Sequence, residues 1–354
     1  MKQVIVVKLV PEPEQYASLL RTLEAFNAAC NWIASVAFGE RTADKFKLQK
    51  LVYRDVRKRF GLSAQMAIRA ISKVCEAYKR DRRIQPSFRL HGAMTYDERI
   101  LAFKGPDRVS LLTLDSRVVV PMRFGAHQAA LLDRKHGQAD LLYREGTFYL
   151  SVTADSPEPT PDEPTGFLGV DLGIVNIATT SDGEVFAGRV VQNVRARFSR
   201  LRAKLQRKGT KSAKRLLRKR RRRERRFQRD LNHRISKALV ARAKGTSRGI
   251  ALEDLKGIRE RVTVRRAQRR VIHSWAFRQL GSFVEYKARL AGVKVVFVDP
   301  RNTSRTCSIC GCTDKANRPT QSQFSCTSCG YAANADVNAA RVIATRAGQP
   351  CHAA

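Results

Sequence analysis

Cys307-Ser308-Ile309-Cys310 and Cys326-Thr327-Ser328-Cys329 are two Cys-x-x-Cys pairs near the C-terminus, with fifteen residues between them. Pairs at this spacing are typical of a zinc ribbon, because two sulfurs on one tight turn can reach the same metal ion. Gly311 and Gly330 follow the pairs, where such turns often need a positive φ. Free or disulfide-bonded cysteines are the alternative, and the paired spacing argues against them. The sequence therefore predicts one structural Zn²⁺, although Cys312 could compete as a ligand, and the predicted ligands are Cys307, Cys310, Cys326 and Cys329.

Three acidic residues stand out by their surroundings. Asp171 lies in the middle of the apolar strand predicted over 166–173, Glu253 at the end of a second strand predicted over 249–255, and Asp336 in the first turn of a helix after the cysteines. Each has an ordinary explanation: backbone donors around Asp171, an arginine beside Glu253, or the positive end of the helix at Asp336. An acid inside an apolar strand is nevertheless costly unless it is paired or binds a metal.

The order of these elements is that of an RNase-H-like nuclease, in which a hairpin, a central strand and a helix each contribute one acid. In such a site three carboxylates hold two Mg²⁺ ions about 4 Å apart. Magnesium prefers carboxylate oxygens and water as ligands, and the six histidines form no cluster in the sequence. The sequence also has no Gly-x-x-x-x-Gly-Lys-Ser/Thr loop, Gly-x-Ser-x-Gly elbow or His-Glu-x-x-His motif. We predict that Asp171, Glu253 and Asp336 are catalytic acids that bind two Mg²⁺ ions.

The charge of the chain points to a polyanionic partner. Its 354 residues include 68 Lys and Arg against 31 Asp and Glu, a net charge of +37, while 43% of the residues are hydrophobic. A folded surface with this excess is normally neutralised by a long nucleic acid. A membrane fits less well, because no apolar run reaches about 18 residues and residues 1–8 do not read as a signal peptide. Cysteines in metal spacing indicate a reducing, cytoplasmic location.

The first 155 residues predict a small β-barrel interrupted by helices. Alternation with a period of two predicts strands over 4–9, 100–103, 109–114, 117–120, 140–144 and 147–153. Apolar residues at helical spacing predict helices over 16–33 and 44–60 and a third one after Ser63, a plausible N-cap. We assign 1–10 and 86–155 to the barrel and 11–85 to an inserted helical lobe, although composition would also allow a β-sandwich.

The remaining chain divides at its composition changes. Residues 156–165 are rich in proline and predict a linker. We expect an α+β nuclease domain over 166–304, with the zinc ribbon over 305–332 inserted before a last helix over 333–346. Residues 347–354 form a tail.

A basic region lies inside the predicted nuclease domain. Between Arg195 and Arg234 the sequence has twenty Lys and Arg and two acids. A thin apolar stripe, interrupted near Gly209, predicts a helical hairpin or a broken helix over 195–240. Such a run could be a solubilising or targeting patch, but on paired helices we expect it to lie along phosphates. The residues predicted to contact nucleic acid there are Lys204, Lys211, Arg215, Arg218 and Arg222.

A second candidate contact surface is the polar face of the helix that follows Ser63. It carries Gln65, Arg69 and Lys73. This face is either solvated, as most charged helix faces are, or it touches a groove of a nucleic-acid duplex. The sequence alone does not separate these two interpretations.

Five motifs in this order resemble the TnpB family of transposon-encoded proteins, which is related to the compact type V CRISPR effectors. They are Val170-Asp171-Leu172-Gly173, Leu252-Glu253-Asp254-Leu255, 303–311, 326–330 and Asn334-Ala335-Asp336-Val337-Asn338-Ala339-Ala340. The resemblance implies an RNA-guided DNA endonuclease with a RuvC nuclease domain, a zinc-bearing module, a wedge barrel and an inserted helical recognition lobe. Carried over by motif, Asp171, Glu253 and Asp336 are its catalytic acids, and the four cysteines of the two pairs are its zinc ligands.

The partners implied by the resemblance are a guide RNA and double-stranded target DNA, bound by a homodimer or a monomer. Proteins of this kind read a short motif beside the target, while guide pairing reads the remaining sequence. Two alternatives would use the same scaffold. A guided DNA-binding repressor would lack the acids, and a transposase would join DNA ends with the same carboxylate chemistry. All three acids are present, which favours the nuclease over the repressor.

Overall fold

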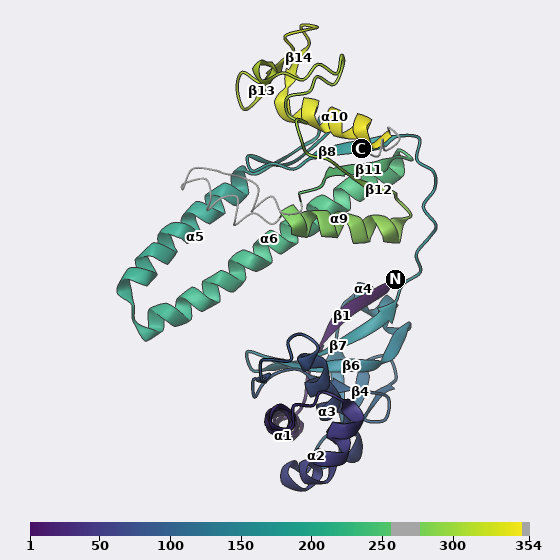
Figure 1. Ribbon diagram of the computed structural model, residues 1–354, viewed down its shortest axis with the longest axis vertical. Helices are drawn as coiled ribbons and strands as arrows, with labels where there is room; N and C mark the ends of the chain where they lie inside the picture. The colour runs from purple at the N-terminus through teal and green to yellow at the C-terminus, as the bar shows by residue number, and fades with distance from the viewer. Residues whose placement is uncertain (256–276, 349–354) are drawn as a thin grey trace. The chain divides into compact units, whose positions relative to one another are not determined.

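The computed structural model describes residues 1–255 and 277–348, apart from the side chains of residues 135–137 and 221–222. The chain forms two compact units, Met1–Pro157 and Glu158–Ala354. Figure 1 colours the chain from purple at the N-terminus to yellow at the C-terminus. The boundary between them falls in the proline-rich segment predicted as a linker. Both units combine helices with a β-sheet, so the mixed α+β class predicted from the sequence is confirmed.

The N-terminal unit is built on a seven-stranded antiparallel sheet in the order β2-β6-β7-β1-β5-β4-β3. Strand β1 (Lys2–Leu9) lies in the middle of this sheet, with Ile5 opposite Val152 of β7. The N-terminal segment therefore joins the strands that follow the helices. The other strands are β2 (Met94–Tyr96), β3 (Leu101–Lys104), β4 (Arg108–Leu112), β5 (Arg117–Arg123), β6 (Lys135–Arg144) and β7 (Thr147–Asp155).

Three helices lie between β1 and β2 in the chain: α1 (Pro13–Gly39), α2 (Lys45–Phe60) and α3 (Ala64–Tyr78). Ser63 caps α3 as predicted, because its hydroxyl accepts from the N–H of Met66. The apolar stripes of these helices and the inner face of the sheet form one continuous hydrophobic core. A short helix that the sequence did not predict, α4 (Ala126–Leu132), connects β5 to β6.

The C-terminal unit contains a five-stranded sheet in the order β10-β9-β8-β11-β12. Strands β8, β9 and β10 form an antiparallel meander, whereas β11 and β12 run parallel to β8. The parallel strands β8 and β11 therefore end at the same edge of the sheet. The strand bounds are β8 (Phe167–Asp171), β9 (Asn176–Thr180), β10 (Val185–Ala187), β11 (Gly249–Glu253) and β12 (Val295–Val298).

Helices cover both faces of this sheet (Figure 1). Leu168, Val170 and Leu252 point to the face packed by α6 (Lys211–Gly245) and α9 (Phe277–Ala291). On the opposite face, Ala251 packs against Ile343 of α10 (Ala335–Gly348). Helix α5 (Arg189–Lys208) and α6 form the helical hairpin predicted for the basic region, and Gly209 with φ of +64° ends α5. None of the helices in the described residues combines the length and the apolar composition that crossing a bilayer requires.

Helix α10 packs on the sheet through an unusually close backbone contact with Gly169 of β8. A Cβ atom at Gly169 would lie 1.9 Å from the carbonyl oxygen of Ala340 and 2.7 Å from the nitrogen of Ala344. Real Cβ atoms do not approach backbone this closely. Only glycine at residue 169 therefore allows α10 to lie where it does.

We predict that Gly169→Ala lowers the free energy of unfolding by roughly 1–3 kcal/mol, the usual cost of overpacking, because α10 must move away from the sheet. Gly281→Ala is the matched control, since Gly281 lies in helix α9 with open space around its Cβ position. The control should stabilise the protein by up to about 1 kcal/mol. Thermal unfolding of both variants tests this, and a Gly169→Ala protein as stable as the wild type would contradict it.

Candidate metal centres and nucleic-acid surfaces

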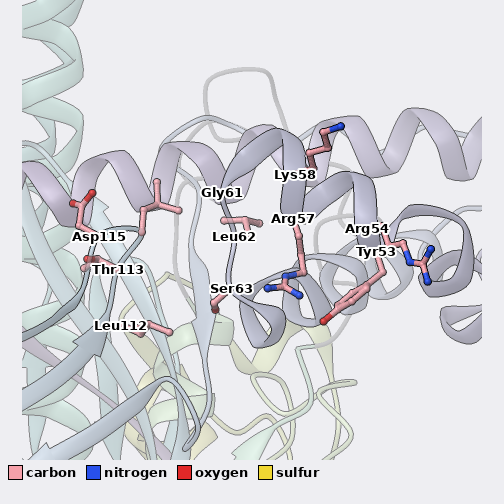
Figure 2. Close-up of a pocket in the computed structure, with 11 residues that line it drawn as sticks. Tyr53, Arg54, Arg57, Lys58, Gly61, Leu62, Ser63, Leu112, Thr113 and Asp115 are labelled. Carbon is pink, nitrogen blue, oxygen red and sulfur yellow. The ribbon is translucent and has the colours of Figure 1, made fainter.

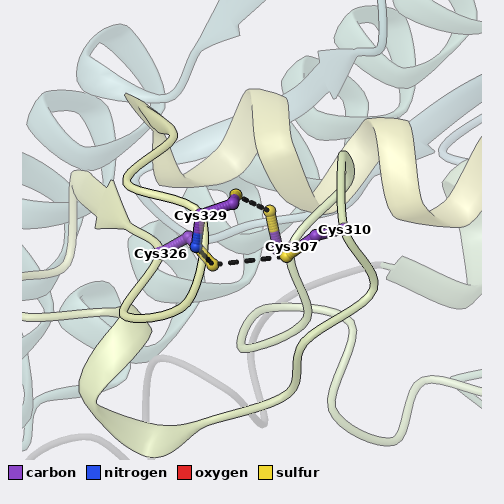
Figure 3. A group of neighbouring side chains, drawn as sticks. All are labelled: Cys307, Cys310, Cys326 and Cys329. Carbon is purple, nitrogen blue, oxygen red and sulfur yellow. Dashed lines mark hydrogen bonds between the residues drawn. The ribbon is translucent and has the colours of Figure 1, made fainter.

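The four predicted cysteines form a compact sulfur cluster (Figure 3). Their ligand atoms all lie within 4.8 Å of one another. The sulfurs of Cys307 and Cys329 are 3.7 Å apart, and those of Cys310 and Cys326 are 3.5 Å apart. A tetrahedral Zn²⁺ with bonds of about 2.3 Å places its sulfur ligands about 3.8 Å from one another. The donor set and its spacing therefore fit zinc, and Cys312 is not part of this group.

Two tight turns present these thiols. The N–H of Gly311 donates to the carbonyl of Cys307 at 3.0 Å, and the N–H of Gly330 donates to the carbonyl of Cys326 at 3.1 Å. Both glycines have positive φ, +75° and +71°, as the sequence predicts. The strands β13 (Gln323–Ser325) and β14 (Ala332–Asn334) flank the second turn as a small hairpin.

A buried asparagine joins the two cysteine turns to each other. The amide nitrogen of Asn317 donates to the carbonyls of Arg305 and Cys312, next to the first turn. Its amide oxygen accepts from the N–H of Thr327 in the second turn, at 2.8 Å. Asn317 is fully buried, so all of its hydrogen-bonding capacity is used inside the ribbon.

A second buried asparagine joins the ribbon to α10. The side chain of Asn338 accepts from the N–H of Ser308 at 3.0 Å and donates to the carbonyl of Thr306 at 2.8 Å. Asn338 lies two residues after Asp336 on the same helix. The position of Asp336 therefore depends on the fold of the first cysteine turn.

The three candidate acids lie on the face of the sheet that α10 covers. Asp171 is the last residue of β8 and Glu253 is the last residue of β11, the parallel neighbour of β8. Asp336 is the second residue of α10. The sequence placed Asp171 in the middle of its strand; the strand instead ends there, because the chain turns tightly at Gly173, where a Cβ would lie 2.6 Å from the carbonyl oxygen of Asn176.

Asp336 is held by polar groups from three different segments. Its Oδ2 accepts from the amide nitrogen of Asn176 at 2.8 Å, and its Oδ1 faces the guanidinium of Arg318 at 3.3 Å. Asn334 caps α10 by accepting from the N–H of Asp336 at 3.0 Å. Arg318 belongs to the zinc ribbon, so the ribbon contributes a cation directly to this acid.

The electrostatics of the site indicate crowded negative charge. Burial and, to a smaller extent, the nearby carboxylates of Glu253 and Asp336 together raise the pKa of Asp171 to about 7, whereas Arg318 acts in the opposite direction. Burial also raises the pKa of Glu253, although the hydroxyl of Thr303, which donates to it at 2.5 Å, counteracts the shift. A carboxylate whose ionisation is opposed in this way is stabilised when a cation binds beside it.

Glu253 and Asp336 thus lie close enough to Asp171 to affect its ionisation. All three side chains offer oxygen donors, as a hard divalent cation requires. Among the residues that the structure describes, only the cysteines bring three or more ligand atoms within 4.8 Å of one another, so the carboxylates are spaced more loosely. Magnesium retains several water ligands and tolerates such spacing.

Several residues around the acids were not predicted from the sequence. Asn176, Thr303 and Arg318 contact the acids, and none of them stands out by spacing or composition. Thr303 and Asn338 lie inside the motifs that carry the family resemblance, which was a usable signal for both. Arg318 is one of 68 basic residues, and only the tertiary fold distinguishes it.

The predicted contact residues on α3 are engaged within the protein. Gln65 and Arg69 both donate to the carboxylate of Asp97, and Arg69 forms an ion pair with it at 2.6 Å. The ammonium of Lys73 donates to the amide oxygen of Asn27 at 2.9 Å and to a backbone carbonyl. Nucleic-acid contacts by these three residues would have to compete with these bonds.

The predicted contact residues on the α5–α6 hairpin are more accessible. Lys204, Lys211, Arg215 and Arg218 are exposed, and none of them forms an ion pair within the described part of the chain. The side chain of Arg222 lies outside the described residues. The four described cations are therefore available to an external anion.

A further basic hollow lies in the N-terminal unit between α2 and the turn from β4 to β5 (Figure 2). Arg54, Arg57 and Lys58 line it and have no carboxylate partner among the described residues. The guanidinium of Arg57 lies 5.7 Å from the ring centre of Tyr53. Asp115, the acid on the other wall, is already paired with Arg21 at 2.7 Å, so the hollow is positively charged.

Family sequence models match most of the C-terminal half. The family described as probable transposase matches residues 149–257, and the family described as Cas12f1-like, TNB domain, matches residues 277–343. The second match covers the two cysteine turns and most of α10.

Curated relatives extend these matches. A putative RNA-guided DNA endonuclease InsQ of Escherichia coli is 29% identical over 304 residues, which is 79% of this chain and 72% of the relative. A CRISPR-associated endodeoxyribonuclease Cas12f1 of Sulfoacidibacillus thermotolerans is 43% identical over 119 residues, 33% of this chain and 27% of the relative. A TnpB-like protein of Methanocaldococcus jannaschii is 34% identical over 166 residues, 46% of this chain and 58% of the relative. The chain thus spans about a quarter to three quarters of the length of these relatives.

Solved structures share the fold. A Cas12f1–sgRNA–target DNA complex matches with a TM-score of 0.64 and 13% sequence identity, over 92% of this chain and 82% of that chain. The mini-RNA-guided endonuclease CRISPR-Cas_phi3 matches with a TM-score of 0.60 over 99% of this chain. The fold is therefore that of the compact effector proteins. Together with the family models and the curated relatives, it supports a TnpB-family protein.

We predict that Cys326→Ser releases zinc. The zinc ion would join the second cysteine turn to the first, and the first turn holds Asn338, so loss of zinc should also loosen α10. Cys312→Ser is the matched control, since Cys312 lies in the same ribbon but outside the sulfur cluster. Elemental analysis should find about one Zn²⁺ per chain in the wild type and the control, and none in Cys326→Ser. Amide hydrogen exchange over 335–340 should accelerate only in Cys326→Ser, and unchanged protection there would contradict the coupling.

We predict that Asp171→Asn stabilises the protein above pH 7 when divalent cations other than zinc are absent. The folded pKa of Asp171 lies above its ordinary value of 3.8, at about 7, so the native state holds an extra proton and stability falls as pH rises between these values. At about 1.4 kcal/mol per pKa unit, the gain is a few kcal/mol at most at pH 8, and it disappears near pH 4. Thermal unfolding against pH measures it.

Asp299→Asn is the control with the opposite sign. Hydrogen bonds from Arg301 lower the pKa of Asp299, so its carboxylate contributes stability above its ordinary pKa and that contribution is lost on acidification. This variant should be no more stable than the wild type at pH 8. An Asp171→Asn protein that is less stable than the wild type at pH 8 would contradict the proposed crowding of charge.

Proposed function

We propose that this protein is an RNA-guided DNA endonuclease that hydrolyses phosphodiester bonds at a single RuvC-like site. The observation that carries the proposal is the convergence of Asp171, Glu253 and Asp336 on one face of the five-stranded sheet, where burial and the other two acids raise the pKa of Asp171. Two of the curated relatives, a putative RNA-guided DNA endonuclease and a CRISPR-associated endodeoxyribonuclease, support the same activity.

The two units fit the domains expected of such an enzyme. The order β10-β9-β8-β11-β12, with three antiparallel and two further parallel strands, supports an RNase-H-like nuclease domain. The zinc ribbon lies between β12 and α10 in the chain, so it is an insertion in that domain. We interpret the seven-stranded sheet as the wedge barrel and α1–α3, which interrupt it after β1, as the inserted recognition lobe.

The chemistry follows from the donor set. Two bound Mg²⁺ ions would lower the pKa of the attacking water and neutralise the charge that develops on the leaving oxygen. Asp171, Glu253 and Asp336 would hold these ions. Asn176 donates a hydrogen bond to Asp336 and Thr303 donates one to Glu253, so these two acids are oriented before substrate arrives. No histidine contacts the three acids in the described residues, consistent with hydrolysis that needs no general-base side chain.

Guide RNA and double-stranded target DNA are the proposed partners. The exposed cations of the α5–α6 hairpin and the basic hollow beside α2 offer phosphate contacts on both units. Contacts of this kind recognise the backbone and the geometry of a guide–target duplex. The target sequence is then read by base pairing with the guide. The four clustered cysteines are not joined by disulfides, which fits action in the reducing cytoplasm.

The decisive experiment uses the full chain with the RNA that copurifies with it. That RNA is sequenced, retargeted to a known DNA, and incubated with Mg²⁺ and a library in which the bases beside the target are randomised. We expect double-strand cleavage next to a short common motif. Asp171→Asn, Glu253→Gln and Asp336→Asn should each lower the cleavage rate about 10³-fold or more.

Asp299→Asn is the matched control. Asp299 follows β12, is exposed, and forms an ion pair with Arg301. It should cleave like the wild type. Binding without cleavage by the wild type would favour a guided repressor, and joining of the cut ends to a second duplex would favour a transposase. Equal cleavage by Asp171→Asn would contradict the proposed site.

A further inference from the structure

Asn176 contacts Asp336 across the site, although 160 residues separate them in the chain. Its amide nitrogen donates to Oδ2 of Asp336 at 2.8 Å, whereas Arg318 faces the other oxygen, Oδ1, at 3.3 Å. Each oxygen of this carboxylate therefore has a separate partner. The bond to Asn176 is the shorter of the two and lies well within the range of a good N–H···O bond.

The turn that leads into Asn176, the first residue of β9, is fixed from two sides. A Cβ at Gly173 would lie 2.6 Å from the carbonyl oxygen of Asn176, so this turn closes tightly on glycine. The N–H of Gly188 donates to the carbonyl of Val175 at 2.8 Å, and the side chain of Gln192 donates to the carbonyl of Ile174 at 3.2 Å. The backbone that carries Asn176 is thus held in place by these contacts. A residue that orients another side chain must itself be fixed in this way.

The two partners of Asp336 differ in what they do to a metal ion. Arg318 is a cation, so it competes with a divalent ion for the same carboxylate oxygen and repels that ion. Asn176 is neutral, so it can retain its hydrogen bond while a metal binds to the remaining oxygen. A neutral donor to a ligating carboxylate is the kind of contact that orients a metal ligand without weakening its charge.

We infer that Asn176 is a positioning residue that holds Oδ2 of Asp336 and leaves Oδ1 to face the metal ion. The inference rests on the proposed function, since it assigns Asp336 as a magnesium ligand. Without Asn176, the carboxylate rotates and remains paired with Arg318, and the metal ion loses an oriented ligand. The loss falls on metal affinity and much less on the rate once the site is saturated with metal.

The test measures Mn²⁺ binding to the full, zinc-loaded chain by electron paramagnetic resonance of free Mn²⁺, without nucleic acid. Asn176→Ala should weaken Mn²⁺ binding about tenfold or more, the usual effect of removing a group that orients a ligand. Asn176→Leu fills the space of the amide without a donor and should give the same loss. Cleavage should need a correspondingly higher Mg²⁺ concentration and reach a maximal rate within a few-fold of the wild type.

Asn232→Ala is the matched control. Asn232 is buried in the same unit and donates one side-chain hydrogen bond, to Gln279 at 3.0 Å, away from the acids. This variant should bind Mn²⁺ within twofold of the wild type. Unchanged affinity in both Asn176 variants, or an equal loss in Asn232→Ala, overturns the inference.

Asp171→Asn separates this inference from the proposed function. If Asp171→Asn loses Mn²⁺ binding and Asn176→Ala does not, only the role of Asn176 is wrong. If Asp171→Asn binds Mn²⁺ like the wild type, the proposed metal site is wrong and the role of Asn176 falls with it.

Discussion

The burial of Asp171 beside two further carboxylates, those of Glu253 and Asp336, is the constraint on which the C-terminal unit depends. Burial and the proximity of Glu253 and Asp336 raise the pKa of Asp171 to about 7, far above its ordinary value of 3.8. One cation, Arg318, and the neutral donors Asn176 and Thr303 offset part of this repulsion. In the proposed site, divalent cations would balance the remaining charge and relieve this unfavourable arrangement.

The architecture holds these acids together through backbone contacts rather than through the acids themselves. Asp171 and Glu253 are fixed by ending two neighbouring parallel strands, whose register pairs Val170 with Leu252. Asp336 is fixed by the seat of α10 on Gly169 and by the bonds between Asn338 and the first cysteine turn. The ribbon therefore holds Asp336, one of the three candidate acids, in position, and it also supplies Arg318.

Local patterns made part of this site predictable. The spacing of the cysteines specifies the zinc cluster, because each pair lies on one turn, and the cluster formed as expected. The two strands that carry Asp171 and Glu253 follow from apolar runs, although the end of the first strand at Asp171 does not. Contacts formed only by the tertiary fold were not predictable: Asn176 and Arg318 reach Asp336 from distant segments. Likewise, the partner of Gln65 and Arg69 on α3 is Asp97, which no helical pattern indicates.

In the N-terminal unit, too, features with a local sequence signal were predictable and features set by the tertiary fold were not. The apolar stripes of α1, α2 and α3 and the cap at Ser63 are local signals, and the structure confirms these helices. Strand β2 has only three residues and α4 only seven, too short for a period to be recognised. The place of β1 between β5 and β7 depends on pairing across the whole unit, which a local pattern cannot specify.

The most direct test of the central claim is a crystal structure of the protein soaked in Mn²⁺, analysed by anomalous scattering at the manganese and zinc edges. We expect manganese between Asp171, Glu253 and Asp336, and zinc among the four cysteines of the ribbon. Zinc in the ribbon with no manganese at the three acids, under conditions that support DNA cleavage, would contradict it.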